Sequence, residues 1–98
     1  MRIEWDPAAL KEFAALDKAV QRRIGAVLNE PQALSPRLQS LGGDLARLRK
    51  LRIGDYRLLC SVTQDTARLT ILVVSHRSQA YSQRNKEAAL RRARRGSA

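Results

Sequence analysis

Apolar and polar residues alternate with a period of two through the middle of the chain, and this pattern constrains the fold more than any other feature. In a strand over residues 49–53, the two aliphatic side chains face one way while Lys50 and Arg52 face the other. A strand from Tyr56 to Val62 follows the same rule and turns Arg57 outward. The pattern therefore predicts a sheet with an apolar side and a cationic side.

Two turns and a third strand complete this segment. Gly54-Asp55 lies where a two-residue hairpin turn belongs, and a second turn is expected at Gln64-Asp65-Thr66. The run from Arg68 to Ser75 is almost continuously apolar, which is typical of a central strand covered over most of its length. We expect three consecutive strands joined by two hairpins.

A strand and a helical hairpin are predicted ahead of this sheet. Arg2-Ile3-Glu4-Trp5 alternates apolar with charged residues, and Asp6-Pro7 offers an N-cap followed by proline at the first helical position. Asp17 marks a break between two helices. The first helix has an apolar stripe of Leu10, Phe13 and Ala14. The second has apolar residues at helical spacing: Val20, Ile24, Val27 and Leu28.

Two prolines and a basic helix frame the rest of the chain. Pro31 and Pro36 stop the second helix, so residues 29–43 are expected to form a loop with one helical turn. Helical spacing returns from Ser82 to Arg95. That segment has six Lys or Arg residues against one Glu, a net +5 that is half of the chain's charge. Leucines are expected to pin the loop to the core: Leu34, Leu38 and Leu41.

The predicted fold class is α+β, with a single domain over residues 1–98. Its order is an N-terminal strand, a helical hairpin, a mainly antiparallel sheet of three to four strands, and a basic C-terminal helix with a frayed tail over residues 82–98. Hydrophobic residues make up 44% of the chain, which suffices for a core at this length. Four residues are assigned to that core because each falls on an apolar face: Trp5, Phe13, Tyr56 and Cys60.

The charge balance favours a polyanionic partner. Nineteen Lys and Arg against nine Asp and Glu give a formal net charge of +10 on 98 residues. This balance is typical of nucleic-acid-binding proteins, and membrane surfaces and acidic proteins attract such a charge as well. The cationic strand face with a nearby tyrosine puts RNA first.

Cysteine and histidine usage bounds the chemistry and the compartment. Cys60 and His76 are the only residues of their kinds, too few for an intramolecular disulfide or a dedicated zinc site. We expect no metal and no other cofactor, and a reducing cytoplasm as the location. The first residues lack the pattern of a signal peptide, and the aliphatic run at residues 71–74 is too short to span a bilayer, so no membrane association is expected.

Three motifs in a fixed order point to a family. They are Leu41-Gly42-Gly43-Asp44-Leu45, then Lys50 to Leu58 with Gly54-Asp55-Tyr56-Arg57 inside it, then Val74-Ser75-His76-Arg77 with Tyr81 four residues on. With the helical hairpin before them, the chain from the first strand to Tyr81 resembles the RelE/ParE superfamily of bacterial toxins.

The resemblance implies an mRNA interferase, the toxin of a type II toxin-antitoxin system, which cuts messenger RNA in the ribosomal A site without a metal. In RelE-like enzymes the ribose 2′-hydroxyl attacks the adjacent phosphodiester and leaves a 2′,3′-cyclic phosphate and a 5′-hydroxyl. By position, Lys50 matches a lysine near the attacking group and Arg57 the arginine that clamps the phosphate. Arg77 matches a later strand-end arginine, and Tyr81 a tyrosine that stacks on the nucleotide. Further RNA contacts are expected from Arg52, His76 and Arg84.

The chain departs from this pattern at Leu48, where some RelE-type enzymes carry a basic residue two positions before Lys50. Arg47 and Arg49 flank Leu48 but belong to the opposite pleat. His76 is a candidate for acid–base chemistry because of its imidazole group, and other members of the superfamily use a histidine close to this point. No carboxylate accompanies His76 on the cationic face, so a strand-end histidine is favoured over a general acid.

Other interpretations stay open for the function. Singly, Arg57 fits a solvated strand residue or a partner of Asp55, and Tyr81 fits a packing residue; together with Lys50 and Arg77 they favour a phosphate site. A ParE-like toxin shares the scaffold but poisons DNA gyrase. A catalytically silent basic domain would only bind RNA or protein.

The resemblance also implies partners: mRNA, the ribosome and an acidic cognate antitoxin in a toxin–antitoxin hetero-oligomer. We expect the antitoxin to cover Lys50, Arg57 and Arg77, or to displace the C-terminal helix around Leu90. The arginines from 91 to 95 are interpreted as solvated by default, with contact to ribosomal RNA or the antitoxin as alternatives.

Overall fold

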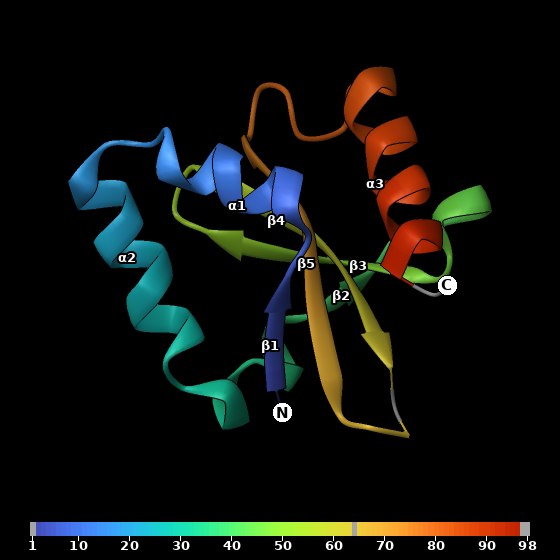
Figure 1. Cartoon of the computed structure of the whole chain (residues 1–98), viewed down its shortest axis with the longest axis horizontal. Helices are drawn as coiled ribbons and strands as arrows, with labels where there is room; N and C mark the ends of the chain where they lie inside the picture. Colours follow the sequence, from blue (N-terminus) through green and yellow to red (C-terminus); the bar gives the residue numbers. More distant parts are fainter. Residues whose placement is uncertain (1, 64, 97–98) are drawn as a thin grey trace.

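A computed structural model of the chain describes residues 2–63 and 65–96 (Figure 1). The strands form one sheet in the order β1-β5-β4-β3-β2, in which β1 is parallel to β5 and all other pairs are antiparallel. The elements are β1 (Arg2–Trp5), α1 (Pro7–Ala14), α2 (Lys18–Leu28), β2 (Gln39–Ser40), β3 (Leu48–Ile53), β4 (Tyr56–Thr63), β5 (Arg68–His76) and α3 (Gln83–Gly96), with short 3₁₀ turns at Pro31–Ala33, Ser35–Arg37 and Gly43–Leu45.

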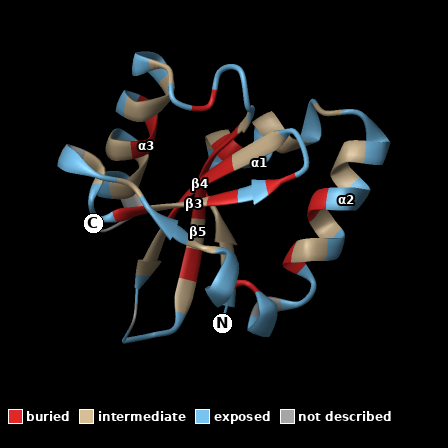
Figure 2. Ribbon diagram, turned by 180° about the vertical axis from the view of Figure 1, so that it is seen from behind, coloured by how far each residue is buried: buried red, intermediate tan, exposed pale blue. Residues whose placement is uncertain are grey.

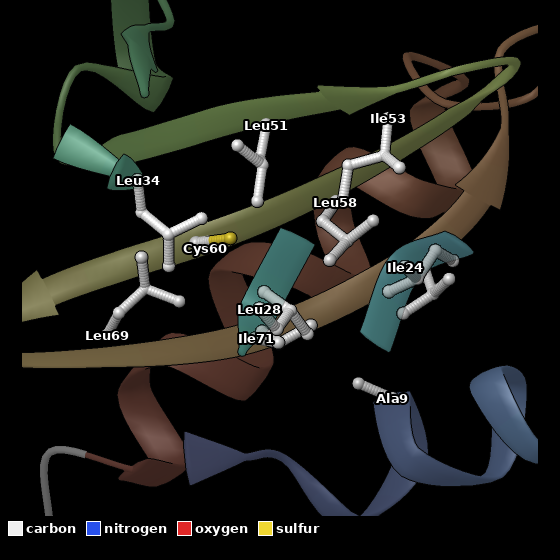
Figure 3. Packing of buried hydrophobic residues seen from close by; sticks show 11 residues of the cluster. Ala9, Ile24, Leu28, Leu34, Leu51, Ile53, Leu58, Cys60, Leu69 and Ile71 are labelled. Carbon is white, nitrogen blue, oxygen red and sulfur yellow. The ribbon is translucent and has the colours of Figure 1, made fainter. Parts of the chain in front are cut away.

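Helices cover both faces of this sheet. The hairpin α1–α2 lies on one face and α3 on the other (Figure 1). Ala9, Ile24 and Leu28 from the hairpin pack with inward residues of β3, β4 and β5 in the larger core (Figure 3). Ala88 and Ala89 of α3 pack on a smaller core on the opposite face. Figure 2 shows the buried residues concentrated along the strands, between these layers.

The predicted fold class and the predicted order of elements are confirmed. Asp6 caps α1, since its carboxylate accepts a hydrogen bond from the Ala8 amide at 2.9 Å, and Pro7 is the first helical residue. Cys60 is buried, whereas Trp5, Phe13 and Tyr56 are partly buried against the same core.

Two local expectations were wrong. The segment at residues 29–43 contains a short fifth strand, because Gln39 and Ser40 pair with Arg49 and Lys50. The stripe of α1 is also rotated: Ala9 is fully buried, whereas Leu10 is 49% exposed. Ala14 is exposed as well. The close approach of the short α1 to β5 selects the small Ala9 for the contact, and Leu10 lies about 100° further round the helix.

A bulge in β5 changes which side chains of this strand pack in each of the two cores. Leu59 pairs with Val73 but Cys60 pairs with Ile71, so Leu72 is an extra residue in the ladder. As a result Leu72 and Val73 both lie under α3, which strict alternation does not allow. Beyond the end of β1, Glu12 of α1 accepts a hydrogen bond from the Val74 amide at 3.0 Å and so satisfies the open edge of β5.

Two arginines of α3 anchor the helix to the rest of the fold. Arg95 Nη2 lies 2.6 and 2.7 Å from the two carboxylate oxygens of Asp6, whose side chain is 4% exposed. Arg92 Nη1 donates to Glu12 Oε2 at 3.0 Å and to the Leu72 carbonyl at 2.8 Å. The solvated interpretation is therefore wrong for Arg92, whose side chain is 13% exposed, whereas Arg95 stays largely exposed although it forms an ion pair.

The ion pairs also set the protonation of Asp6. Burial of its carboxylate opposes ionisation, but the hydrogen bonds from Arg95 and the Ala8 amide, with the charges of Arg95 and Arg92, outweigh burial and hold the pKa of Asp6 below its usual value. Asp6 is thus a charged N-cap shared between α1 and α3.

The remaining expectations concern the turns and the ends of the chain. Gly54-Asp55 forms the β3–β4 turn, with Gly54 at φ +58°. The β4–β5 turn includes Asp65–Ala67, while Gln64 and the tail residues 97–98 lie outside the described residues. Within the described residues, no helix has the length and apolar character needed to cross a membrane.

Candidate functional site

A cationic stripe runs along the hairpin of β3 and β4. Lys50 and Arg52 lie on the pleat of β3 that faces α3, and Arg57 is the cross-strand partner of Arg52. The helix covers only the part of this face over Leu48 and Leu59, so Lys50 and Arg57 stay partly exposed and Arg52 exposed. Like charges directly opposite one another destabilise a hairpin, so this arrangement favours binding of an anion.

Tyr81 joins one end of the stripe. Its ring is 39% exposed in the loop between β5 and α3, and the Lys50 Nζ lies 5.5 Å from the ring centroid. This cation–π contact fixes an ammonium group and an aromatic face side by side. The two side chains open onto a pocket of about 220 Å³, whose other walls are Leu41, Gly42, Leu45 and Lys86.

Arginines gather at the other end of the stripe, around the β3–β4 turn. Arg57 Nη1 donates to the carbonyls of Gly54 and Tyr56, each at 2.9 Å. The Arg77 amide donates to the Asp55 carbonyl at 2.7 Å, and its guanidinium Nε lies 3.7 Å from the Asp55 carboxylate. The strand-end arginine is thereby tied to the hairpin that carries Arg57.

A third arginine reaches the same turn from α2. Arg23 Nη1 lies 2.8 Å from the position that a Cβ on Gly54 would occupy. The positive φ of Gly54 explains why glycine is favoured at the first turn position, whereas an added Cβ would only displace the flexible end of the Arg23 side chain. Arg23 was not predicted as a site residue, because no local pattern on α2 indicates that it reaches a turn thirty residues away.

The structure sets two predicted site residues apart from the stripe. His76 pairs across the sheet with Tyr56, and their rings meet edge-on at 5.5 Å between centroids, on the face that carries α1 and α2. Its Nδ1 lies 2.9 Å from the Ser78 hydroxyl. Arg84 lines a separate pocket, which also includes Glu12 and Arg92.

Leu48 has a structural role in this chain. It shares the pleat of Lys50 but is 1% exposed and packs in the core under α3. A basic residue at this position would be buried beneath Ala89, at a large desolvation cost. The departure from the RelE-type pattern is thus linked to the way α3 covers this end of the sheet.

Arg84 was predicted as a site residue and Lys86 was not, although helical spacing places their side chains on different sides of α3. Residues two apart on a helix point about 200° away from each other, so only one of them can face the Tyr81 loop. Lys86 lines the pocket with Lys50 and Tyr81. The buried positions Ala88 and Ala89 fix the orientation of α3, and that signal was present in the sequence.

The remaining reactive groups lie elsewhere. Burial raises the pKa of the Cys60 thiol to about 12, so this side chain is neutral in the core and does not act as a nucleophile. Residues 2–63 and 65–96 contain no group of three or more His, Cys, Asp or Glu side chains able to hold a metal ion. The functional groups that the stripe brings together are those of Lys, Arg and Tyr.

Comparison with protein families gives one match over most of the chain. The model of the ParE toxin of type II toxin-antitoxin systems, parDE, matches residues 3–81. This span runs from β1 to Tyr81 and contains the whole cationic stripe. A search of curated proteins finds no significant match.

Solved structures share the fold. A double mutant of the Escherichia coli toxin RelE in the free state matches with a TM-score of 0.72 at 24% identity, covering 93% of this chain and 95% of that one. RelBE2, a toxin-antitoxin complex of Mycobacterium tuberculosis, matches with a TM-score of 0.65 at 25% identity, covering 78% of this chain and 96% of that one. The RelE–RelB complex of Pyrococcus horikoshii matches with a TM-score of 0.60 at 28% identity, covering 81% of this chain and 97% of that one.

Proposed function

This chain belongs to the family of ParE toxins of type II toxin-antitoxin systems, within the RelE/ParE superfamily, and from its cationic stripe, rather than from this membership, we propose that it is a metal-independent endoribonuclease. Its substrate is messenger RNA in the ribosomal A site, and it acts in the cytoplasm. The observation that carries the proposal is the contact between Lys50 and Tyr81 at the end of a stripe of exposed cations.

The stripe supplies the charge stabilisation that phosphodiester cleavage requires. The ribose 2′-oxygen gives its proton to water and bonds to phosphorus, while the bond from phosphorus to the 5′-oxygen breaks and that oxygen takes a proton from water. The products are a 2′,3′-cyclic phosphate and a 5′-hydroxyl. Arg57 and Arg77 stabilise the negative charge that develops on the phosphate, Lys50 lies next to the attacking group, and Tyr81 stacks on the nucleotide.

Cleavage is expected to survive metal chelation. In a purified translation system, EDTA at a level that leaves the ribosomes intact should not change the cleavage rate, because Lys, Arg and Tyr carry the chemistry. The fragments should end in 2′,3′-cyclic phosphates and begin with 5′-hydroxyls, as measured by end-specific ligation. Fragments with 5′-phosphates, or strict dependence on added manganese, would contradict the mechanism.

A second candidate function is inhibition of DNA gyrase, as the resemblance to ParE toxins implies. Two observations favour it: the matching family model is that of ParE toxins, and the buried Leu48 removes one basic position from the cationic face. The retained residues Lys50, Arg57, Arg77 and Tyr81 favour the ribonuclease. A catalytically silent binding domain is the outcome if neither RNA cleavage nor gyrase inhibition is detected.

An antitoxin is the expected partner, since several structural relatives are toxin-antitoxin complexes. We propose an acidic segment that covers the cationic stripe or competes with α3 near Leu90. A pocket of about 620 Å³ lies beside Leu90, and its lining includes the cations Arg47 and Arg94 and the apolar Leu48 and Val62. Apolar anchors flanked by acidic side chains complement this pocket.

Binding of the antitoxin should be steered by charge. With a net charge of +10, the association rate is expected to fall steeply between low and physiological salt, while the dissociation rate changes less. Stopped-flow measurement over a salt series tests this expectation. An association rate that does not respond to ionic strength would refute the steering.

A further inference from the structure

We propose that Lys86 completes a nucleotide-binding pocket with Lys50 and Tyr81, an inference that rests on the proposed action on RNA. In this pocket Tyr81 stacks on one base of single-stranded RNA, and the ammonium groups of Lys50 and Lys86 bind the adjoining phosphate. The pocket's volume of about 220 Å³ lies below the roughly 300–1,000 Å³ of sites for drug-sized ligands, so it has room for the base of one nucleotide rather than for a larger ligand.

The walls of the pocket match the parts of a nucleotide. The 3₁₀ turn at Gly43–Leu45 and the preceding Leu41 supply apolar surface, and both leucines are partly buried against the core under α3. The Tyr81 ring and the Lys50 ammonium, 5.5 Å from the ring centroid, line the same pocket. Stacking of a base on an exposed aromatic ring is a sequence-tolerant mode of single-strand recognition.

No acidic residue in the first turn of α3 offsets the positive charge of Lys86. Ser82 caps the start of α3, with its hydroxyl accepting from the Asn85 amide at 3.2 Å, but the first turn has no acidic residue. A lysine near the helix N-terminus adds to the positive end of the helix dipole, which is unfavourable unless an anion is bound there. Within the described part of the chain, no ion pair joins Lys50 or Lys86 to a carboxylate.

The test is the salt dependence of RNA binding by Lys86→Gln. The probe is a fluorescein-labelled hexanucleotide with 2′-O-methyl riboses, which cannot be cleaved by attack of the 2′-hydroxyl. Fluorescence anisotropy of the full chain should show about tenfold weaker binding for the variant and a log–log salt slope smaller by about 0.7, the value for one lost phosphate contact on a single strand. Lys18→Gln, an exposed lysine at the start of α2, removes the same charge and should change neither quantity.

A second variant tests the pocket without changing any charge. Gly42 lines the pocket with φ −86° and ψ 177°, an extended backbone that any residue adopts, and nothing lies within 4 Å of an added Cβ. Gly42→Phe should therefore keep the fold and weaken RNA binding by filling the pocket.

The outcomes separate this inference from the ribonuclease proposal. Equal binding and equal slopes for Lys86→Gln and Lys18→Gln would overturn the inference, and so would a wild-type chain that does not bind the probe. Cleavage of mRNA on translating ribosomes is measured in parallel with the wild-type chain. Normal binding without cleavage would refute the ribonuclease and leave the pocket supported.

Discussion

Replacing Arg57 by alanine is expected to lower the rate of mRNA cleavage by about 10²–10³ and to abolish growth arrest. Its guanidinium lies on the cationic face and donates to the surface carbonyls of Gly54 and Tyr56, which water can solvate in the variant. The fold should therefore persist. Arg77→Ala should behave alike, because its pair with Asp55 at 3.7 Å is exposed and contributes little stability.

The measurement is single-turnover cleavage on programmed ribosomes, with thermal unfolding of each variant as the check on folding. Arg22→Ala is the matched control, since Arg22 is an exposed arginine of α2 on the opposite side of the sheet. It removes the same charge and should leave cleavage unchanged. Full toxicity of both the Arg57 and Arg77 variants at wild-type expression would show that the phosphate contacts are wrongly assigned.

Replacing Asp6 by alanine is expected to lower the free energy of unfolding by about 1–2 kcal/mol, the largest stability effect of any single polar substitution proposed for this chain. The change removes the N-cap of α1 and leaves Arg95 without its partner, which joins α3 to α1. Asp6→Asn keeps a capping oxygen but loses the charge, so its cost should be roughly 1 kcal/mol smaller.

Acid unfolding gives this prediction a second readout. The pKa of Asp6 is lower in the folded chain than in the unfolded one, so the stability from its ionised form is fully present above the unfolded value near 3.8 and is lost as the pH falls through the folded value. The difference between wild type and Asp6→Asn should be constant at neutral pH and shrink below about pH 4. Chemical denaturation across pH measures it; identical stabilities at pH 7 would contradict the role of the ion pair.

Local sequence patterns predicted much of the fold. Alternation at residues 49–53 placed Leu51 and Ile53 inward, and both are buried. Asp6-Pro7 and Gly54-Asp55 predicted a helix start and a hairpin turn that the structure has. These signals succeed because each depends on backbone geometry within a few residues.

Features that depend on distant contacts were not predictable in the same way. The parallel pairing of β1 with β5 and the extra residue Leu72 in β5 arise from how separate elements fit together. The four arginines at 91, 92, 94 and 95 look alike in the sequence, and the register of α3 on the sheet decides that Arg92 and Arg95 reach the carboxylates of Glu12 and Asp6. Of the candidate site, the stripe followed from alternation, whereas the contributions of Lys86 and Arg23 required the packing of α3 and α2.

The most direct test of the central claim is a map of mRNA 5′ ends after induction of the protein in cells, with the Arg57→Ala variant induced to the same level. The ribonuclease account predicts new 5′-hydroxyl ends within translated codons for the wild type and none for the variant. Growth arrest without such ends, accompanied by gyrase-dependent breaks in DNA, would contradict it and establish the second candidate function.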